Sequence, residues 1–375
     1  MPKIVSYIST KFNSVKNALG IKDTTGNPNF SSVKNTSTST IWYVSDLSEK
    51  KTSVPQVSSK LKKVNNIKGL VSTEVLNKLY YVANSPQYDE NNYQCVPNSR
   101  YGSGIPYCKK TLIESNGILL PANNVSVNNS PYTTIASQYP LNNKESLRHY
   151  FNMLFDNDIK TVYVLASNKD IECDLSKPDI EYDKINSQQK GFKYFREDFY
   201  SDNIKSCRFR KWDFSRFEIK GENRKVIENK ILGDDRQLDC KVYINKLTKE
   251  GSDENKYIKF VHIYNWPDHT AIDATKLKNT INIIGGNLKI NPTKENIAVH
   301  CLAGLGRTGE FIALMEMMKM IEAGNTKTKS LESIICDLRE KRSMHLLKKR
   351  EQVDELIKFA INNHIPLVND HIKIK

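Results

Sequence analysis

The sequence predicts an α/β protein of the α+β type, built on a highly twisted mixed β-sheet with helices on both of its faces. Three strand-like runs follow one another between residues 207 and 266. The chain from 308 to 363 instead repeats apolar residues at helical spacing. Strands in the middle, with helices on the flanks and at the end, are the layers from which such a fold is packed.

The expected elements run in order from about residue 60. One or two helices are expected over 59–83, and a helix over 144–158 leads into a strand over 160–167. Strand patterns follow in the runs CRFRKWDFSRFEIK (207–220), CKVYINKLTKE (240–250), YIKFVHIYNW (257–266) and NIAVH (296–300). Apolar residues three and four apart then predict three helices, over 308–324, 330–342 and 350–363.

The first 60 residues differ in composition from residues 61–375, which we expect to form one globular domain. Within 1–22, lysines and no acidic residue accompany apolar residues at the spacing of an amphipathic helix, namely Ile4, Ile8, Phe12, Val15 and Leu19. This pattern fits a helix or partly disordered tail that packs on another surface, a membrane-surface anchor, or a docking segment for a chaperone. Residues 23–58 are rich in Ser, Thr, Asn and Lys, which is typical of a linker.

Composition narrows the functional classes. The formal net charge of +14 favours anionic partners such as nucleic acid, acidic lipid or phosphorylated protein. The lysines and arginines are spread along the chain without a nucleic-acid-binding motif, so we expect acidic phosphopeptides, and not nucleic acid, as partners. No run approaches the ~18 apolar residues of a transmembrane helix, and the N-terminus lacks the pattern of a secretory signal peptide.

The cysteines and histidines show no metal-binding or disulfide pattern. Seven cysteines, an odd number, are scattered without C-x-x-C spacing. This argues against a disulfide framework and a zinc site, and for a reducing compartment. The histidines form no H-x-x-x-H or Cys/His ligand set, so neither a metal nor another cofactor is expected.

The stretch AVHCLAGLGRTGEF (298–311) contains the chemistry of the candidate site. Between a strand pattern and a helix pattern lie residues small enough for a tight turn with inward N–H groups, namely Leu302, Ala303, Gly304, Leu305 and Gly306. Such amides and the helix dipole favour an anion, and the planar fork of Arg307 binds two phosphate oxygens. The same surroundings stabilise a thiolate, so Cys301 is a candidate nucleophile for phosphorus; the alternative is a buried cysteine beside an ordinary tight turn.

This stretch resembles the signature loop of the cysteine-dependent protein tyrosine phosphatases. The resemblance implies the fold of that family, and it places Thr308 among the catalytic residues and His300 among the supporting ones. NWPDHT (265–270) is similar to the W-P-D loop of the family, which implies that Asp268 is the general acid, with Trp266 in support. A positioned carboxylic acid is needed because tyrosinate leaves poorly until it receives a proton.

Two further stretches match the family less completely. NSRYGSG (98–104) resembles the phosphotyrosine loop, which implies that Tyr101 stacks on the substrate ring and makes the pocket too deep for phosphoserine. Ser103 stands where this loop usually has an aspartate that binds the substrate backbone. RSMHLLKKREQVDELI (342–357) resembles the glutamine loop that positions the hydrolytic water; it keeps Gln352, whereas Lys348 replaces the other glutamine.

The likeness is greatest to the tyrosine phosphatase effectors that pathogenic bacteria inject through type III secretion, and it covers about residues 80–370. It includes NSPQY, SQYPLNNKESLRHYFNML, VYVLASNKDI, YFRE, NWPDHT and EQVDELIKFA. By this resemblance Asp170 stands where those enzymes use a glutamate to brace the catalytic arginine. The resemblance also implies that residues 1–60 are a secretion and chaperone-binding segment.

The sequence therefore predicts a monomeric protein tyrosine phosphatase that works through a phosphocysteine, and the resemblance implies a virulence effector acting on signalling proteins in the host cytosol. Two alternatives stay open. Ser103 is compatible with a broader phosphatase for phosphoserine or phosphoinositides, and Lys348 with a phosphotyrosine-binding module of weak turnover. Against that module, the chain keeps the three residues that degenerate family members generally lose, Cys301, Arg307 and Asp268.

Overall fold

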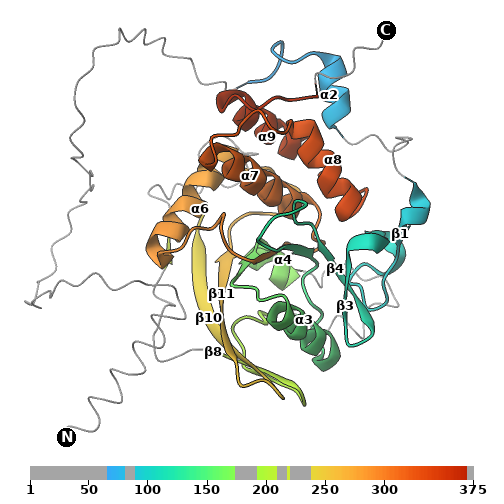
Figure 1. Ribbon diagram of the computed structural model, residues 1–375, viewed down its shortest axis with the longest axis vertical. Helices are drawn as coiled ribbons and strands as arrows, with labels where there is room; N and C mark the ends of the chain where they lie inside the picture. The colour runs from blue at the N-terminus through green and yellow to red at the C-terminus, as the bar shows by residue number, and fades with distance from the viewer. Residues whose placement is uncertain (1–65, 81–88, 174–191, 209–217, 220–237, 370–375) are drawn as a thin grey trace, which may run out of the picture.

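The computed structural model describes five stretches of the chain (Figure 1), which are residues 66–80, 89–173, 192–208, 218–219 and 238–369. The predicted N-terminal segment, 1–60, lies outside the described residues. Within these ranges, no helix is long and apolar enough to cross a bilayer.

The described strands form one mixed sheet and one small ribbon. The sheet contains β3 (Leu112–Ser115), β4 (Ile118–Asn124), β5 (Thr134–Ser137), β6 (Thr161–Val164), β7 (Phe199–Tyr200), β8 (Ile204–Arg208), β9 (Glu218–Ile219), β10 (Cys240–Lys249), β11 (Asn255–Ile263) and β12 (Ile297–His300). Their order is β3-β4-β5-β12-β6-β11-β10-β8-β7, with β9 paired to β10. The four central strands β5, β12, β6 and β11 are parallel to one another, and the outer pairs are antiparallel. The separate ribbon joins β1 (Tyr93–Gln94) and β2 (Tyr107–Cys108).

Helices cover both faces of this sheet, as the sequence predicts. On one side lie α6 (Ala274–Leu288), α7 (Gly306–Glu322), α8 (Leu331–Lys341) and α9 (Arg350–Asn362), and on the other lies α3 (Lys144–Asp156) (Figure 1). The shorter helices are α2 (Thr73–Leu79), α4 (Asn168–Cys173) and the 3-10 turns η1 (Glu90–Asn92), η2 (Gly102–Gly104) and η3 (Lys109–Thr111).

Alternation along the central strands explains why both faces are buried. In β6, Val162 and Val164 pack in the same core cluster as Phe151 of α3. Tyr163 points to the opposite face and packs against Phe311 of α7, with ring centres 4.6 Å apart. Successive side chains of a strand point to opposite faces, so a strand such as β6 that is buried at every position belongs in the middle of a covered sheet.

The expected elements match the observed ones except at a few places. The strand expected over 160–167 ends at Val164, and the pattern over 207–220 includes β8 and β9 with residues outside the description between them. The strands β1 to β5 and β7 and the helices α4 and α6 are additional to the expected elements. Of the helix or helices expected over 59–83, the described residues contain α2 alone. Asp273 caps α6 by accepting the Lys276 N–H at 2.9 Å, but the pair Gly285-Gly286 near its end weakens the helical pattern.

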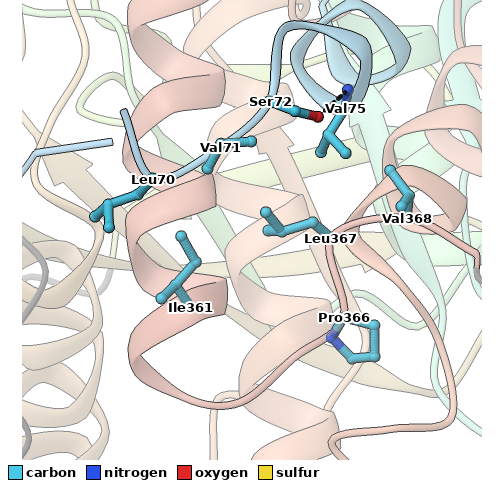
Figure 2. Close-up of a pocket in the computed structure, with 8 residues that line it drawn as sticks. All are labelled: Leu70, Val71, Ser72, Val75, Ile361, Pro366, Leu367 and Val368. Carbon is cyan, nitrogen blue, oxygen red and sulfur yellow. Dashed lines mark hydrogen bonds between the residues drawn. The ribbon is translucent and has the colours of Figure 1, made fainter. Parts of the chain in front are cut away.

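A groove of about 420 Å³ lies where the start of the described chain meets the end of α9 (Figure 2). Its lining is mostly aliphatic and consists of Leu70, Val71, Ser72, Val75, Ile361, Pro366, Leu367 and Val368. None of these residues belongs to the motifs of the candidate site. The groove is therefore separate from the chemistry that the sequence predicts.

Two isoleucines of α6 test the packing of this helix. Ile281 is fully buried, whereas Ile283 is 48% exposed. We expect Ile281→Ala to lower the free energy of unfolding by about 2–5 kcal/mol, because the deletion leaves a cavity. Ile283→Ala, the matched control, should change it by less than about 0.5 kcal/mol. Urea denaturation measures both, and equal losses would contradict the observed packing.

Candidate active site

The predicted site residues follow the carboxyl ends of the parallel strands at the centre of the sheet. Cys301 follows β12, Asp170 lies shortly after β6, and Trp266 and Asp268 follow β11. Parallel strands end at the same edge of a sheet, and ligands of α/β proteins bind outside that edge. This topology brings together residues that are far apart in the sequence.

Cys301 begins the glycine loop, residues 301–306, which connects β12 to α7. The residue is 3% exposed, and its Sγ accepts a hydrogen bond from the Gly304 N–H at 3.3 Å. Thr308 Oγ1 accepts the Cys301 N–H at 2.9 Å, which ties the start of the loop to the first turn of α7. The sulfur thus lies at the N-terminus of a 17-residue helix, where negative charge is favoured.

Gly304 allows the glycine loop to pass close to β5. Its φ is +70°, and a Cβ atom there would lie 2.0 Å from the Ser137 carbonyl oxygen. On the protein side of the loop, the buried Arg342 donates from Nε to the Gly304 carbonyl oxygen at 3.3 Å. Burial lowers the pKa of Arg342 to about 10, and electrostatic interactions with Tyr107 and Cys301 act in the opposite direction. Arg342 therefore fixes the loop and places a positive charge behind it.

Arg307 connects the glycine loop to two other segments. The side chain is 1% exposed, and its Nη1 donates to the carbonyl oxygens of Leu165 at 3.1 Å and Trp266 at 2.7 Å. The same Nη1 donates to Asp170 Oδ2, and Nη2 donates to Asp268 Oδ1 at 2.9 Å. The guanidinium is thereby held at a fixed orientation beside the loop.

The charge of Arg307 is secured by its neighbours. Burial acts to lower the pKa of Arg307, but the negative charges of Cys301, Asp268 and Asp170 raise it on balance. Asp170 is itself fixed, because its Oδ2 accepts the Ser167 N–H at 2.8 Å. Among the described residues, Arg307 Nε has no hydrogen-bond partner. A buried donor of this kind suits an oxyanion, which the rest of the loop also favours.

His300 supports the loop and takes no charge at neutral pH. Its Nδ1 lies 3.1 Å from the Cys301 carbonyl oxygen and its Nε2 lies 2.7 Å from the Tyr194 hydroxyl. Burial lowers the pKa of His300 to about 4. These partners assign a neutral ring in which Nδ1–H donates to Cys301 and Nε2 accepts from Tyr194.

The W-P-D loop, residues 264–273, connects β11 to α6 and contains the predicted acid. Trp266 is fully buried, and its Nε1 donates to the Thr270 carbonyl oxygen at 3.1 Å, which closes the loop on itself. The Asp268 side chain is 42% exposed, and its Oδ1 also accepts the His269 N–H at 2.9 Å. Asp268 thus stands at the rim of the site, within reach of solvent and of Arg307.

Gln352 of α9 lies between the W-P-D loop and the glycine loop. Its Nε2 donates to the Thr270 carbonyl oxygen at 3.1 Å, and a Cβ atom on Gly306 would lie 3.1 Å from its Oε1. This Oε1 is buried without a hydrogen-bond partner in the described part of the chain. Lys348, at the position of the other expected glutamine, is exposed.

Tyr101 lies on a loop that packs beside the glycine loop. Ile105 and Tyr107, which follow it, form a small core cluster against which Ala303 and Leu305 pack. Tyr101 itself is 38% exposed. The segment that follows Tyr101 therefore packs beside the glycine loop, and Tyr101 itself is exposed.

Sequence reasoning misses three residues that contact this constellation. Tyr194 belongs to the stretch YFRE, which resembles the family but suggests no role by itself. Arg342 is the last residue of an expected helix, where a basic side chain is ordinary. Glu310 gives the one usable signal, because it is an acidic residue just before the apolar run FIALM of a helix that must be buried.

The site offers hydrogen-bond donors, one of which is positively charged. These donors are guanidinium and backbone N–H groups, which suit an anion and not a metal ion. Within the described ranges, no group of three or more His, Cys, Asp or Glu side chains could hold a metal ion. Six cysteines within these ranges form no disulfide bond, namely Cys95, Cys108, Cys207, Cys240, Cys301 and Cys336.

Residues 90–362 match the family model described as protein-tyrosine phosphatase. The chain belongs to this family. A solved structure agrees in fold: the protein tyrosine phosphatase TbPTP1 of Trypanosoma brucei superimposes with a TM-score of 0.52 at 18% sequence identity, covering 78% of this chain and 92% of that chain. The fold class predicted from the sequence is confirmed.

Bacterial members of the phosphatase family are among the relatives. The chain is 27% identical to tyrosine-protein phosphatase YopH of Yersinia enterocolitica over 282 residues, which are 71% of this chain and 50% of YopH. It is 24% identical to the secreted effector protein SptP of Salmonella paratyphi A over 264 residues, which are 68% of this chain and 40% of SptP. The chain thus spans about half the length, or less, of these relatives. The predicted likeness to bacterial phosphatases of this kind is confirmed.

Two glycines with positive φ allow the cost of backbone strain to be measured separately from the cost of a steric clash. Gly304 and Gly324 have φ values of +70° and +68°, but a Cβ atom on Gly324 would meet nothing within 4 Å. We expect Gly324→Ala to lower the free energy of unfolding by about 1–2 kcal/mol through backbone strain. Gly304→Ala should cost roughly 1–3 kcal/mol more, because its methyl group meets the Ser137 carbonyl. Equal losses in urea denaturation would contradict the close approach of the loop to β5.

Proposed function

We propose that this chain is a protein tyrosine phosphatase that hydrolyses phosphotyrosine through a phosphocysteine intermediate. The observation that carries the proposal is the joint position of three groups. The Cys301 sulfur accepts the Gly304 N–H, Arg307 presents a buried unpaired Nε, and Asp268 is hydrogen-bonded to the same guanidinium. This is a nucleophile, an oxyanion site and an acid within one constellation.

In the first step, the Cys301 thiolate attacks phosphorus while the bond from phosphorus to the phenol oxygen breaks. Arg307 and the loop N–H groups stabilise the charge on the equatorial oxygens, as a preformed oxyanion site does. Asp268 donates its proton to the departing phenol oxygen. The exposed position of Asp268 supports this role, because the leaving group must depart toward solvent.

In the second step, a water oxygen attacks phosphorus and the bond from sulfur to phosphorus breaks, which restores the thiolate. Asp268, now a carboxylate, accepts the proton of the water. Gln352 would orient that water, since its unpaired buried Oε1 lies next to Gly306 at the edge of the glycine loop. Lys348 stands exposed where the family usually has a second glutamine, so Gln352 is the amide that this site offers.

Depth supports phosphotyrosine as the substrate. Cys301 is 3% exposed, so phosphorus must be carried to the floor of the site on a long side chain. Tyr101, at the rim, would stack on the phenyl ring, an arrangement that serine and threonine phosphates cannot use. Thr308, His300, Trp266 and Asp170 would act on the loops and on Arg307, not on the substrate.

We also propose that the chain acts as a secreted effector on signalling proteins in a host cell. Support comes from its likeness to SptP, which is named a secreted effector protein, and from the basic, amphipathic composition of residues 1–22. In this proposal residues 1–60 direct secretion and bind a chaperone, and residues 61–375 are the catalytic domain. The net charge of +14 suits acidic phosphopeptides.

Cys301→Ser tests the enzymatic proposal. We expect turnover of phosphotyrosine peptides to fall roughly 10³-fold or more, because a serine hydroxyl is not ionised at neutral pH. The control is Cys336→Ser, which replaces a cysteine on α8 that forms no disulfide bond and should leave turnover unchanged. In a single-turnover assay the wild type should form a phosphocysteine.

Three results would contradict this reading. Turnover that survives in Cys301→Ser would exclude Cys301 as the nucleophile. Binding of phosphotyrosine by the wild type without any phosphocysteine would indicate a binding module. A kcat/KM on phosphothreonine peptides or inositol phosphates equal to that on phosphotyrosine peptides would indicate the broader phosphatase that Ser103 leaves open.

Fusion of residues 1–60 to a reporter enzyme tests the proposed secretion. In a bacterium that carries a type III apparatus, the fusion should deliver the reporter into the cytosol of contacted host cells. Residues 61–375 fused in the same way should not. Delivery of the second fusion alone, or of neither, would contradict the assignment of a secretion segment to residues 1–60.

A further inference from the structure

Helix α7 contacts both arms of the W-P-D loop. Arg307 in its first turn donates to the Trp266 carbonyl oxygen on the incoming arm. Glu310, three residues further along and on the same side of the helix, accepts the Ile272 N–H on the outgoing arm, with 3.1 Å between Oε1 and the nitrogen. Asp268 lies between these two anchors.

Glu310 is an unusual residue for this place. Its side chain is fully buried, and in the described part of the chain it forms no salt bridge and its Oε2 has no hydrogen-bond partner. Burial raises the pKa of Glu310 well above its ordinary value, and the nearby Glu355 adds to this; the Ile272 hydrogen bond and Arg307 oppose it. Burial thus opposes a charge on this carboxyl group. An aliphatic residue would fill this place without the cost of burying a carboxyl group.

What the carboxyl group supplies is an acceptor for one buried N–H. Ile272 is 2% exposed, so water does not replace the Glu310 oxygen there. A buried N–H without a partner is costly, and the outgoing arm of the loop would shift to find another. The hydrogen bond thus fixes where the loop rejoins the core.

The two anchoring side chains, Arg307 and Glu310, differ in whether a bound substrate would compete for their hydrogen bonds. Arg307 must turn part of its donor capacity to the phosphoryl oxygens, and its contact with Asp268 is then in competition. Glu310 faces the core and the loop, and it shares no hydrogen bond with the glycine loop. The Ile272 anchor therefore does not compete with a bound phosphoryl group, whereas the Asp268 contact of Arg307 does.

We propose that Glu310 is a positioning residue that holds the W-P-D loop, and with it Asp268, in the place from which the acid protonates the leaving group. This rests on the proposed phosphatase function and adds a residue to it. Glu310 touches neither substrate nor the reacting atoms; it acts through the Ile272 N–H.

The test compares Glu310→Met, which keeps the length but removes the acceptor, with Glu310→Gln, which keeps an acceptor oxygen. For phosphotyrosine peptide, Glu310→Met should lower kcat about 10- to 100-fold with little change in KM, part of the 10²- to 10⁴-fold loss expected for Asp268→Ala. For 4-nitrophenyl phosphate the loss should be clearly smaller, because a more acidic leaving group needs less protonation. Glu310→Gln should retain most of the activity on both substrates.

Two measurements keep the test independent of other causes. Glu316→Met on the same helix removes a carboxylate that pairs with Lys319 at 2.7 Å, and it should change neither kcat nor its dependence on the leaving group. Backbone hydrogen exchange of residues 266–272 should be faster in Glu310→Met than in the wild type and Glu316→Met. If Glu310→Met does not fold, Glu310→Asp, whose oxygen is withdrawn by one methylene, should show the same selective loss.

Several results would overturn the proposal. Equal losses on the two substrates, a Glu310→Gln variant as impaired as Glu310→Met, or unchanged exchange in the loop would each do so. A wild type without turnover would instead refute the phosphatase function. The exchange experiment would then still decide whether Glu310 holds the loop.

Discussion

The buried guanidinium of Arg307 is the group on which the rest of the site depends. It is almost fully buried, yet it keeps its charge because carboxylates and carbonyl groups surround it. Its partners come from two segments, with Leu165 and Asp170 after β6 and Trp266 and Asp268 after β11, while Arg307 itself lies on a third segment, which follows β12. A charge removed from water must be paired and hydrogen-bonded, so this requirement fixes the relative places of all three segments.

A second buried guanidinium, that of Arg342, lies at the floor of the site. Arg342 lies behind the glycine loop and donates to three uncharged oxygens, on Gly304, Asn123 and Pro121. His300, which is neutral because burial lowers its pKa, hydrogen-bonds the Cys301 carbonyl oxygen and the Tyr194 hydroxyl without adding charge. Arg307, Arg342 and the N-terminus of α7 all lie near Cys301 and together favour an anion in the glycine loop. These groups therefore favour negative charge at the place where Cys301 is the proposed nucleophile.

How far the sequence predicts this site depends on the separation of the residues involved. Cys301, Gly304, Arg307 and Thr308 lie within one turn and the start of one helix, so their spacing alone indicates an anion-binding loop. Asp268 and Gln352 required a resemblance to known motifs. Among the elements missed, β3 to β5 and α6 carry weak or interrupted patterns, such as the Gly285-Gly286 pair.

The sequence by itself indicated a candidate nucleophile, a candidate anion-binding loop and the alternation that buries the central strands, because these depend on contacts between near neighbours in the chain. Only the tertiary structure decided which distant groups complete the site. Arg307 and Asp170 are 137 residues apart, Glu310 and Ile272 are 38 apart, and Tyr194 and His300 are 106 apart. Such partners follow from the parallel order of β5, β12, β6 and β11, which gathers four strand ends at one edge. The spacing of neighbouring residues in the sequence does not predict this strand order, because strand pairing depends on which faces of distant elements pack together.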